Sequence, residues 1–457
     1  MSVLDRIFQR SADETIHPLH QGETKSASEL AHFTLRISNY RHLRRAYGED
    51  AAFAAVDELV HRVERILADS CIATAGANGR IMVSMTDLPQ FQTDGSARAW
   101  GIWLWSLCAA MSSLPVQAGP AAVFPLLSAD WNLLPDGNRP EGLEPANPWH
   151  MEDLAPDAWL EKGDPWAQRY RADMASAIEA LASIGPVGLR RQDCTGPIVL
   201  LLWQPVRDAR NPDDVLYYEA LLRFVDGDGV WVAPTAALLA LERLGMINLL
   251  DHHIVSRVVA TLEGEPDARL AVNISARSAR PDPWWHDIQA RLRAAPDVAR
   301  RLTIEITETA ALPDIASAVR FVEEMRRLGC KIALDDFGVG FASIRQIMAL
   351  SPDIVKVDGL FLRRADVSEG EGETFLRMVQ LVKALGATVI AEGVETQAQA
   401  DLALEAGALW QQGYHWGRPA VSQAWRVMET SEPPRICAPD AAALAHLQPV
   451  ILAGSAG

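Results

Sequence analysis

The feature that most constrains the fold is a regular alternation of short β-rich runs with amphipathic helical stretches, beginning near residue 190. Eight such runs occur: IVLLLWQPV, LYYEALLRF, RLAVNIS, LTIEITE, KIALDDF, IVKVD, TVIAEG and LWQQGY. Eight strands with intervening helices over about 240 residues predict an α/β fold, a TIM-type (β/α)8 barrel. The first two runs are joined only by RDARNPDD, too short for a helical crossover, so we expect one antiparallel strand.

The C-terminal ends of these strands, where barrels of this type carry their chemistry, hold polar side chains in otherwise apolar runs. In chain order they are Glu219, Arg223, Asn273, Glu305, Glu308, Asp335, Asp336, Lys356, Glu392 and Gln412. Buried polar groups are costly unless they pair with one another or bind metal. A salt-bridge network is one interpretation, but six carboxylates against one lysine and one arginine leave four negative charges unpaired. Bound cations are the interpretation we favour for the whole set.

The type of cation follows from the donor atoms, which are carboxylate and amide oxygens without cysteine or histidine at the strand ends. Mg²⁺ or Mn²⁺ fits such ligands and structural zinc does not. Two ions about 4 Å apart, bridged by one carboxylate, are the usual arrangement for phosphodiester hydrolysis. Adjacent Asp335 and Asp336 can both reach one site only where the strand gives way to a loop, as Gly338 and Gly340 suggest.

Strand alternation also places Arg223 on the same face as Glu219, four residues earlier. We therefore expect a guanidinium beside the metals, where it can hold a phosphate group.

Eight short motifs occur in order within residues 190–430. They are EALLR at 219–223, ERLGMI at 242–247, VNISAR at 272–277, EITET at 305–309, DDFGVGFASI at 335–344, KVD at 356–358, AEGVE at 391–395 and QGY at 412–414. In order and spacing this part of the chain resembles an EAL-domain cyclic di-GMP phosphodiesterase. Gly359 departs from the family, which commonly has arginine at this position.

The resemblance implies hydrolysis of cyclic di-GMP to linear pGpG, by in-line attack of hydroxide on one phosphodiester with two Mg²⁺ or Mn²⁺ ions per site. The implied metal ligands, with Asp335 bridging the ions, are Glu219, Asn273, Glu305, Asp335 and Asp336. Implied catalytic residues are Lys356 and Glu392, which hold or activate the water, and Glu308, which anchors the DDFG loop. The expected substrate-binding residues are Arg223, Gln412 and Gln204.

The N-terminal half resembles a GGDEF diguanylate-cyclase fold, through FTLRISNYRHLRRAYGEDAAF and the hairpin segment ATAGANGRIMVSM. Its catalytic letters are missing, because GANGR replaces GGDEF, and Arg36 and Ser38 occupy the positions of the metal-binding aspartates. Arg44 replaces a base-contacting asparagine. Without these carboxylates Mg–GTP has no hard-oxygen site, so we expect a smaller, inactive α+β domain. A scaffold, dimerisation or regulatory role is the preferred interpretation, and an unrelated ligand is the alternative.

Residues 126–165 are dense in Pro, Gly, Asn and Asp, which is typical of a long connection. The helical pattern WAQRYRADMASAIEALASIG follows and joins the two halves. The expected divisions are a tail at 1–28, the degenerate GGDEF-like domain and linker at 29–165, a connecting helix at 166–189, the EAL barrel at 190–435 and a second tail at 436–457.

A formal net charge of −17 argues against a broad surface for a nucleic acid polymer or a membrane. The charged N-terminus MSVLDRIFQRSADE lacks the features of a secretory leader, and we expect no membrane span. Five scattered cysteines fit reduced thiols in the cytoplasm.

Two classes of function remain: a phosphodiesterase, and a catalytically silent cyclic di-GMP receptor that acts through a protein partner. Receptors of this type typically lose metal-binding carboxylates, whereas every ligand position survives here, which favours the enzyme. A homodimer and an unknown regulatory protein partner complete the expectations.

Overall fold

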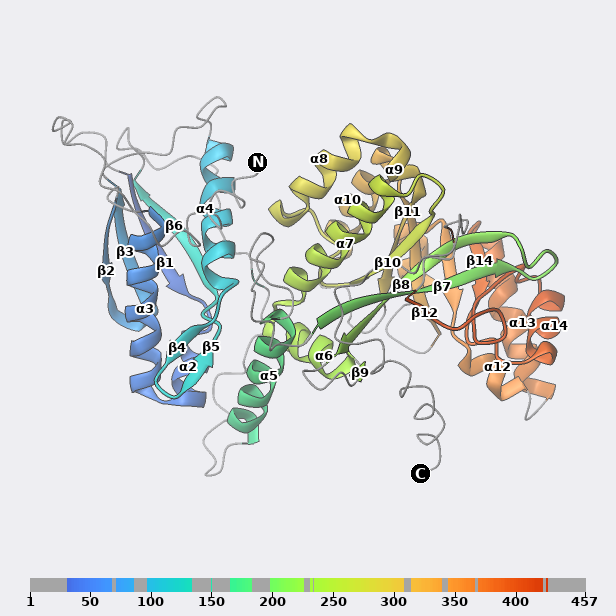
Figure 1. Ribbon diagram of the computed structural model, residues 1–457, viewed down its shortest axis with the longest axis horizontal. Coiled ribbons are helices and arrows are strands. Elements are labelled where there is room, and N and C mark those ends of the chain that lie inside the picture. The colour runs from blue at the N-terminus through green and yellow to red at the C-terminus, as the bar shows by residue number, and fades with distance from the viewer. Residues whose placement is uncertain are drawn as a thin grey trace, which may run out of the picture.

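The computed structural model describes residues 31–67, 71–85, 97–133, 149, 165–182, 198–225, 231–232, 234–307, 314–338, 344–365, 369–421 and 425. These residues form an N-terminal sheet unit (residues 31–133) and a C-terminal barrel, with one long helix between them in sequence (Figure 1).

The N-terminal sheet unit contains one antiparallel sheet of four strands in the order β2-β3-β1-β6. Its strands are β1 (Ala31–Ile37), β2 (Cys71–Ala75), β3 (Arg80–Met85) and β6 (Leu127–Leu133), with a separate hairpin of β4 (Val116–Ala118) and β5 (Ala121–Val123). Its helices are α2 (Tyr40–Tyr47), α3 (Glu49–Leu67) and α4 (Ala97–Ser112), with a 3₁₀ turn, η2 (Ala77–Gly79). This α+β arrangement agrees with the expected class of the N-terminal half.

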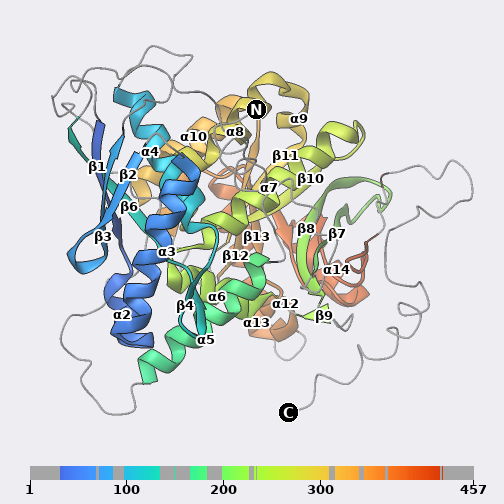
Figure 2. The same cartoon turned by 60° about the vertical axis from the view of Figure 1, so that its left-hand side comes forward.

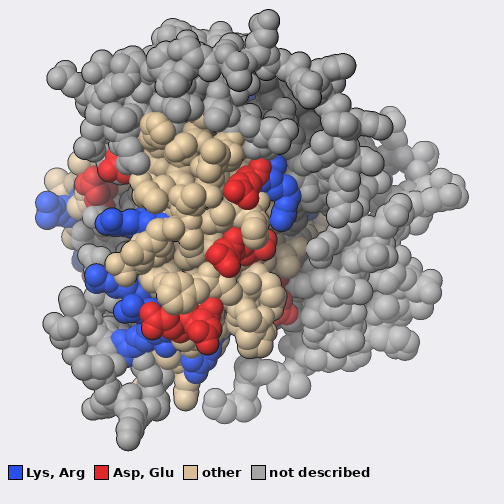
Figure 3. Space-filling model, turned by 90° about the vertical axis from the view of Figure 1, so that its left-hand side faces the viewer, with Lys and Arg blue, Asp and Glu red and all other residues tan. Residues whose placement is uncertain are grey.

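One face of this sheet is buried because its strands alternate apolar and polar residues. Phe33 and Leu35 of β1 are fully buried, and Phe33 packs edge-on against Trp103 of α4 with ring centroids 5.9 Å apart. The other face leaves Ile72 and Met82 largely exposed. Figure 3 looks at the side of the molecule formed by this unit, where charged side chains of both signs lie in small separate groups among uncharged residues.

The connecting helix α5 (Pro165–Ala182) contacts both parts of the molecule (Figures 1 and 2). Toward the N-terminal sheet unit, the Tyr170 hydroxyl accepts a hydrogen bond from Asn39, and Arg171 donates to the Ala46 carbonyl. Toward the barrel, Asp173 pairs with Arg243. The sequence predicted this helix over 166–189, of which residues 183–189 lie outside the described part of the chain.

The barrel is a closed sheet in the order β10-β11-β12-β13-β14-β15-β7-β8, in which β8 returns to β10. Its strands are β7 (Ile198–Asp208), β8 (Val215–Val225), β10 (Leu270–Ser275), β11 (Leu302–Thr307), β12 (Lys331–Phe337), β13 (Ile354–Val357), β14 (Thr388–Ala391) and β15 (Trp410–Gln411), with β9 (Trp231–Val232) beside β8. β7 is antiparallel to both of its neighbours, β15 and β8, and the other barrel pairs are parallel. The predicted TIM-type fold with one antiparallel strand is confirmed.

Helices cover the outside of the barrel and bury the outward residues of the parallel strands (Figure 2). They are α6 (Thr235–Leu244), α7 (Ile247–Gly264), η3 (Pro283–Trp285), α8 (His286–Ala294), α9 (Pro296–Arg301), α10 (Ile315–Leu328), α11 (Ile344–Leu350), α12 (Leu360–Ala365), α13 (Glu369–Ala384) and α14 (Gln397–Ala406). Among the helices of the described residues, none combines the length and the hydrophobicity that a membrane span requires.

Candidate active site

Polar side chains from consecutive barrel strands converge at the C-terminal ends of those strands. We call this set the acidic ring: Glu219 of β8, Asn273 of β10, Glu305 of β11, Asp335 and Asp336 of β12, Lys356 of β13, and Glu392 directly after β14. The ladder between β10 and β11 places Asn273 beside Glu305 at the same level of the barrel. The sequence predicted all of these positions for the site, and the structure brings them together.

An apolar layer inside the barrel supports the acidic ring. Its members are Val206, Tyr217, Ala271, Ala333, Ile354 and Ile390. Five of these precede a ring residue by two positions, four within one strand and Ile390 with Glu392 just past the end of β14, so strand alternation turns both inward. The apolar layer therefore fills the barrel interior directly beneath the polar residues of the ring.

Lys356 is the centre of the acidic ring and is only 1% exposed. Its Nζ lies 3.0 Å from Glu219 Oε2, 2.8 Å from Glu305 Oε2, 3.0 Å from Asp335 Oδ1 and 2.8 Å from Glu392 Oε1. Burial acts to lower the pKa of Lys356, but these carboxylates outweigh it and hold that pKa well above its usual value. One permanent positive charge thus faces four carboxylates.

Two amide side chains hold Glu219. Asn273 Nδ2 donates to Glu219 Oε1 at 2.6 Å, and Gln412 Nε2 donates to Glu219 Oε2 at 2.6 Å. Burial acts to raise the pKa of Glu219, but Lys356 and these donors lower it below its usual value. Gln204 lies opposite Glu219 in the β7–β8 ladder and donates to the Gly417 carbonyl at 3.0 Å. Gln204 and Gln412 are both buried against the ring.

Adjacent Asp335 and Asp336 both face the site because the backbone of β12 is irregular between them. The register with β13 shifts between Leu334 and Phe337, and Asp336 has a left-handed φ of 57°. Aspartate tolerates this conformation better than most residues. From the sequence we expected the strand to give way to a loop at the glycines that follow. In the structure the backbone irregularity lies at Asp336 itself, within the strand. Gly338 is also left-handed, at φ 107°, and Gly340 lies outside the described residues.

The carboxylates form two groups that share one member. One oxygen each from Glu219, Glu305 and Asp335 lie within 4.8 Å of one another, as do oxygens from Asp335, Asp336 and Glu392. Asp335 belongs to both groups, which is the arrangement expected of a carboxylate that bridges two ions.

Burial opposes ionisation of most of these carboxylates. It raises the pKa of Glu305 to about 8 and that of Asp336 to about 6. The pKa values of Asp335 and Glu392 are also raised, first by burial and then by neighbouring carboxylates. With Lys356 as the only cation of the ring among the described residues, burial and mutual repulsion therefore work against full ionisation of these carboxylates.

Divalent cations fit this donor set. The buried oxygens Asn273 Oδ1 and Glu305 Oε1 have no hydrogen-bond partner among the described residues. Unpartnered buried oxygens are costly, and both belong to chemical types that bind Mg²⁺ or Mn²⁺. Together with the shared position of Asp335, they make a site for hard divalent ions the best account of the cluster.

One predicted residue, Arg223, makes no contact with the acidic ring among the described residues, and a second, Glu308, cannot be placed because it lies outside those residues. Arg223 is half-buried on β8 and donates to the carbonyl of neighbouring Leu222 at 2.7 Å. Across the described ranges, no ion pair joins it to a ring carboxylate.

Tyr217 belongs to the layer beneath the acidic ring, and the sequence analysis did not predict its position there. It is 2% exposed, and burial followed by the charge of Glu305 raises its pKa well above the usual value. Tyr217 precedes Glu219 by two positions in the same strand. Strand alternation, which predicted that Glu219 faces the barrel interior, predicts the same for Tyr217.

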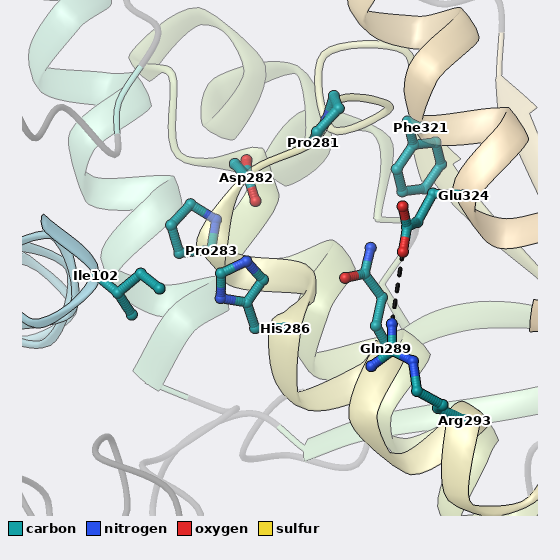
Figure 4. Close-up of a pocket in the computed structure, with 9 residues that line it drawn as sticks. All are labelled: Ile102, Pro281, Asp282, Pro283, His286, Gln289, Arg293, Phe321 and Glu324. Carbon is teal, nitrogen blue, oxygen red and sulfur yellow. Dashed lines mark ion pairs between the residues drawn. The ribbon is translucent and has the colours of Figure 1, made fainter. Parts of the chain in front are cut away.

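A separate pocket of about 690 Å³ lies where α4 meets η3, α8 and α10 (Figure 4). Ile102 faces Asp282 and His286 across it, and Arg293 pairs with Glu324 at 3.5 Å on its far side. No member of the acidic ring lines this pocket. It is therefore distinct from the candidate active site.

Comparisons with known proteins identify relatives of this chain. "Cyclic di-GMP phosphodiesterase PdeF" of Escherichia coli K12 is 25% identical over 269 residues, which cover 58% of this chain and 34% of that protein. An "Uncharacterized signaling protein" of Caulobacter vibrioides is 25% identical over 420 residues, 91% of this chain and 50% of that protein. The chain thus spans about a third to a half of the length of these curated relatives.

Among solved structures, "PaMucR Phosphodiesterase, c-di-GMP complex" is 26% identical and covers 49% of this chain and 92% of its own, with a TM-score of 0.44. The EAL domain family matches residues 191–419, which contain every residue of the acidic ring. The chain therefore belongs to the EAL domain family.

Proposed function

We propose that the barrel hydrolyses cyclic di-GMP to linear pGpG by a two-metal mechanism. The observation that supports this most directly is the pair of carboxylate groups that share Asp335 at the C-terminal ends of the strands. Similarity to PdeF, whose name states cyclic di-GMP phosphodiesterase activity, gives the substrate class.

The residues proposed to hold two Mg²⁺ or Mn²⁺ ions are Glu219, Asn273, Glu305, Asp335 and Asp336. Bound there, such ions polarise the phosphodiester and lower the pKa of a water molecule. The free oxygens of Asn273 and Glu305 support this assignment.

The other side chains orient the reactants. Lys356 holds four carboxylates in place and supplies positive charge as negative charge develops on the phosphoryl oxygens. Glu392, 2.8 Å from Lys356, is placed to orient the attacking water and to take up its proton. We assign phosphate binding to Arg223, further substrate contacts to Gln204 and Gln412, and anchoring of the DDFG loop to Glu308.

The test is to incubate the purified full-length protein with cyclic di-GMP and Mg²⁺ or Mn²⁺ and to separate the products by chromatography. We expect pGpG, its loss in excess chelator, and its loss in Asp335→Asn but not in the control Asp401→Asn. Asp401 is an exposed aspartate of α14. Tight binding of cyclic di-GMP without turnover would contradict the proposal and support the alternative, a silent receptor acting through a protein partner.

We further propose that the N-terminal sheet unit is an inactive, GGDEF-like regulatory or dimerisation module. Arg36 and Ser38 have no carboxylate with which to bind a metal ion. Arg36 lies opposite Arg80 across the β1–β3 ladder, and the Ser38 hydroxyl donates to Ser128. Both candidate metal clusters found among the described residues belong to the barrel. A homodimer, a regulatory protein partner, a cytoplasmic location and the predicted domain divisions remain part of this proposal.

A further inference from the structure

Two consecutive residues at the end of α6 reach in opposite directions. Arg243 donates from Nε to Asp173 Oδ2 at 2.8 Å and from Nη2 to Asp173 Oδ1 at 2.5 Å, which is a bidentate pair with the connecting helix α5. The preceding residue, Glu242, accepts a hydrogen bond from the Ser275 hydroxyl at 2.7 Å. One short helix segment therefore joins α5 to the end of strand β10.

Ser275 is held by two buried carboxylates. Its hydroxyl donates to Glu242, and its backbone N–H donates to Asp251 Oδ2 at 2.9 Å. Glu242 is 8% exposed and Asp251 is 6% exposed. Burying carboxylates is costly, so apolar packing alone does not account for two of them at one serine.

The strand held in this way carries Asn273, two residues before Ser275. Asn273 Nδ2 holds Glu219 at 2.6 Å, while its Oδ1 is buried and has no hydrogen-bond partner among the described residues. A shift at the end of β10 moves this oxygen and the carboxylate that its amide holds.

We infer that Glu242 is a positioning residue for Asn273, and that the Asp173–Arg243 pair couples the position of α5 to the metal-binding end of β10. The inference rests on the proposed function, because it treats Asn273 as a metal ligand. It gives one physical route by which the N-terminal part of the chain would affect the barrel, as the proposed regulatory role requires. Groups that orient metal ligands typically change metal affinity or activity ten- to hundredfold when removed.

The first test compares Glu242→Ala with Glu242→Gln in the full-length protein. Mn²⁺ affinity is measured by calorimetry without substrate, and kcat and KM are measured for cyclic di-GMP. We expect Glu242→Ala to weaken Mn²⁺ binding about tenfold to a hundredfold and to lower kcat more than it changes KM. Glutamine keeps an oxygen that accepts from Ser275, so Glu242→Gln should retain most of the affinity. Unchanged Mn²⁺ affinity in a folded Glu242→Ala protein overturns the inference.

The second test uses the ion pair, which lies partly at the surface and tolerates substitution more readily. Asp173→Ala should weaken Mn²⁺ binding roughly two- to thirtyfold, the range found for residues that couple distant sites. The charge exchange Asp173→Arg with Arg243→Asp should restore part of the loss. The matched control is Glu263→Ala, which removes another bidentate partner of an arginine, Arg291, on the outer helices α7 and α8.

Equal effects of Asp173→Ala and Glu263→Ala on Mn²⁺ affinity would refute the coupling. The proposed function fails separately, if the wild-type protein binds Mn²⁺ but releases no pGpG. In that case the affinity measurements still decide the inference. A wild-type protein that binds no Mn²⁺ overturns both.

Discussion

Replacing Lys356 with methionine removes the one described cation that touches four carboxylates of the acidic ring. The side chain is 1% exposed, so water cannot take its place without opening the barrel. Breaking a buried ion pair by removing one partner typically costs about 3–5 kcal/mol. We expect the metal-free variant to lose about this much of its free energy of unfolding at pH 8. For a domain of this size the melting temperature should fall by roughly 6–20 °C.

The loss should shrink as the pH falls, because the carboxylates take up protons and no longer require a counter-charge. Mn²⁺ should stabilise the variant more than the wild type, because the ions replace a missing positive charge. The extra stabilisation follows from preferential binding to the folded state. Without Lys356 the carboxylates and the water are no longer oriented, so hydrolysis should be lost even with metal bound.

The assay is urea unfolding followed by circular dichroism, in chelator and in Mn²⁺, at pH 6 and pH 8. Lys331→Met is the matched control, because Lys331 is exposed at the start of β12. It should change the free energy of unfolding by less than about 0.5 kcal/mol. If Lys356→Met matches this control in chelator at pH 8, Lys356 does not neutralise the ring and the reasoning is wrong.

Three further outcomes are expected. Asp335→Asn should lower kcat at least roughly a hundredfold while its circular dichroism spectrum stays that of the wild type, because both carboxylate groups lose their shared member; near-wild-type turnover would contradict the metal assignment. Ca²⁺ should inhibit hydrolysis that Mg²⁺ or Mn²⁺ supports, since the larger ion prefers more ligands at longer distances, and full activity in Ca²⁺ alone would refute this. Burial raises the pKa of Asp251 from 3.8 to about 7, so its ionisation destabilises the fold progressively from about pH 4 to pH 7. Asp251→Asn should therefore gain up to about 4 kcal/mol over the wild type at pH 8 and almost nothing below pH 4, as measured by urea unfolding.

The barrel was predictable because its signals are local. Eight apolar runs set the strand number, and the short link between the first two excluded a parallel crossover, as the antiparallel β7–β8 pair confirms. Alternation within each run then assigned the inward residues. These inferences need only strand periodicity and chain length.

The detailed geometry of the site was not predictable in the same way. The left-handed backbone of Asp336 depends on a register shift between β12 and β13, which two sequence segments decide together. The contacts of Lys356 depend on the relative heights of strands β8, β11, β12 and β14. The expectation for Arg223 used alternation alone, which gives the face of a strand but not the contacts of a long side chain; its guanidinium donates to the Leu222 carbonyl, and its role at the phosphate stays a prediction.

Gly359 stands where the family commonly has arginine, and the structure shows which atoms a side chain at this position would contact. A Cβ atom at this position would lie 2.8 Å from the Glu392 carbonyl oxygen and 2.8 Å from Gly393 Cα. Both are backbone atoms, so a side chain here requires the segment after β14 to move. That segment carries the Glu392 carboxylate that contacts Lys356. Because Gly359 has no side chain, the segment after β13 can approach the Glu392 backbone closely. A larger residue at position 359 would therefore displace Glu392 and change its contact with Lys356.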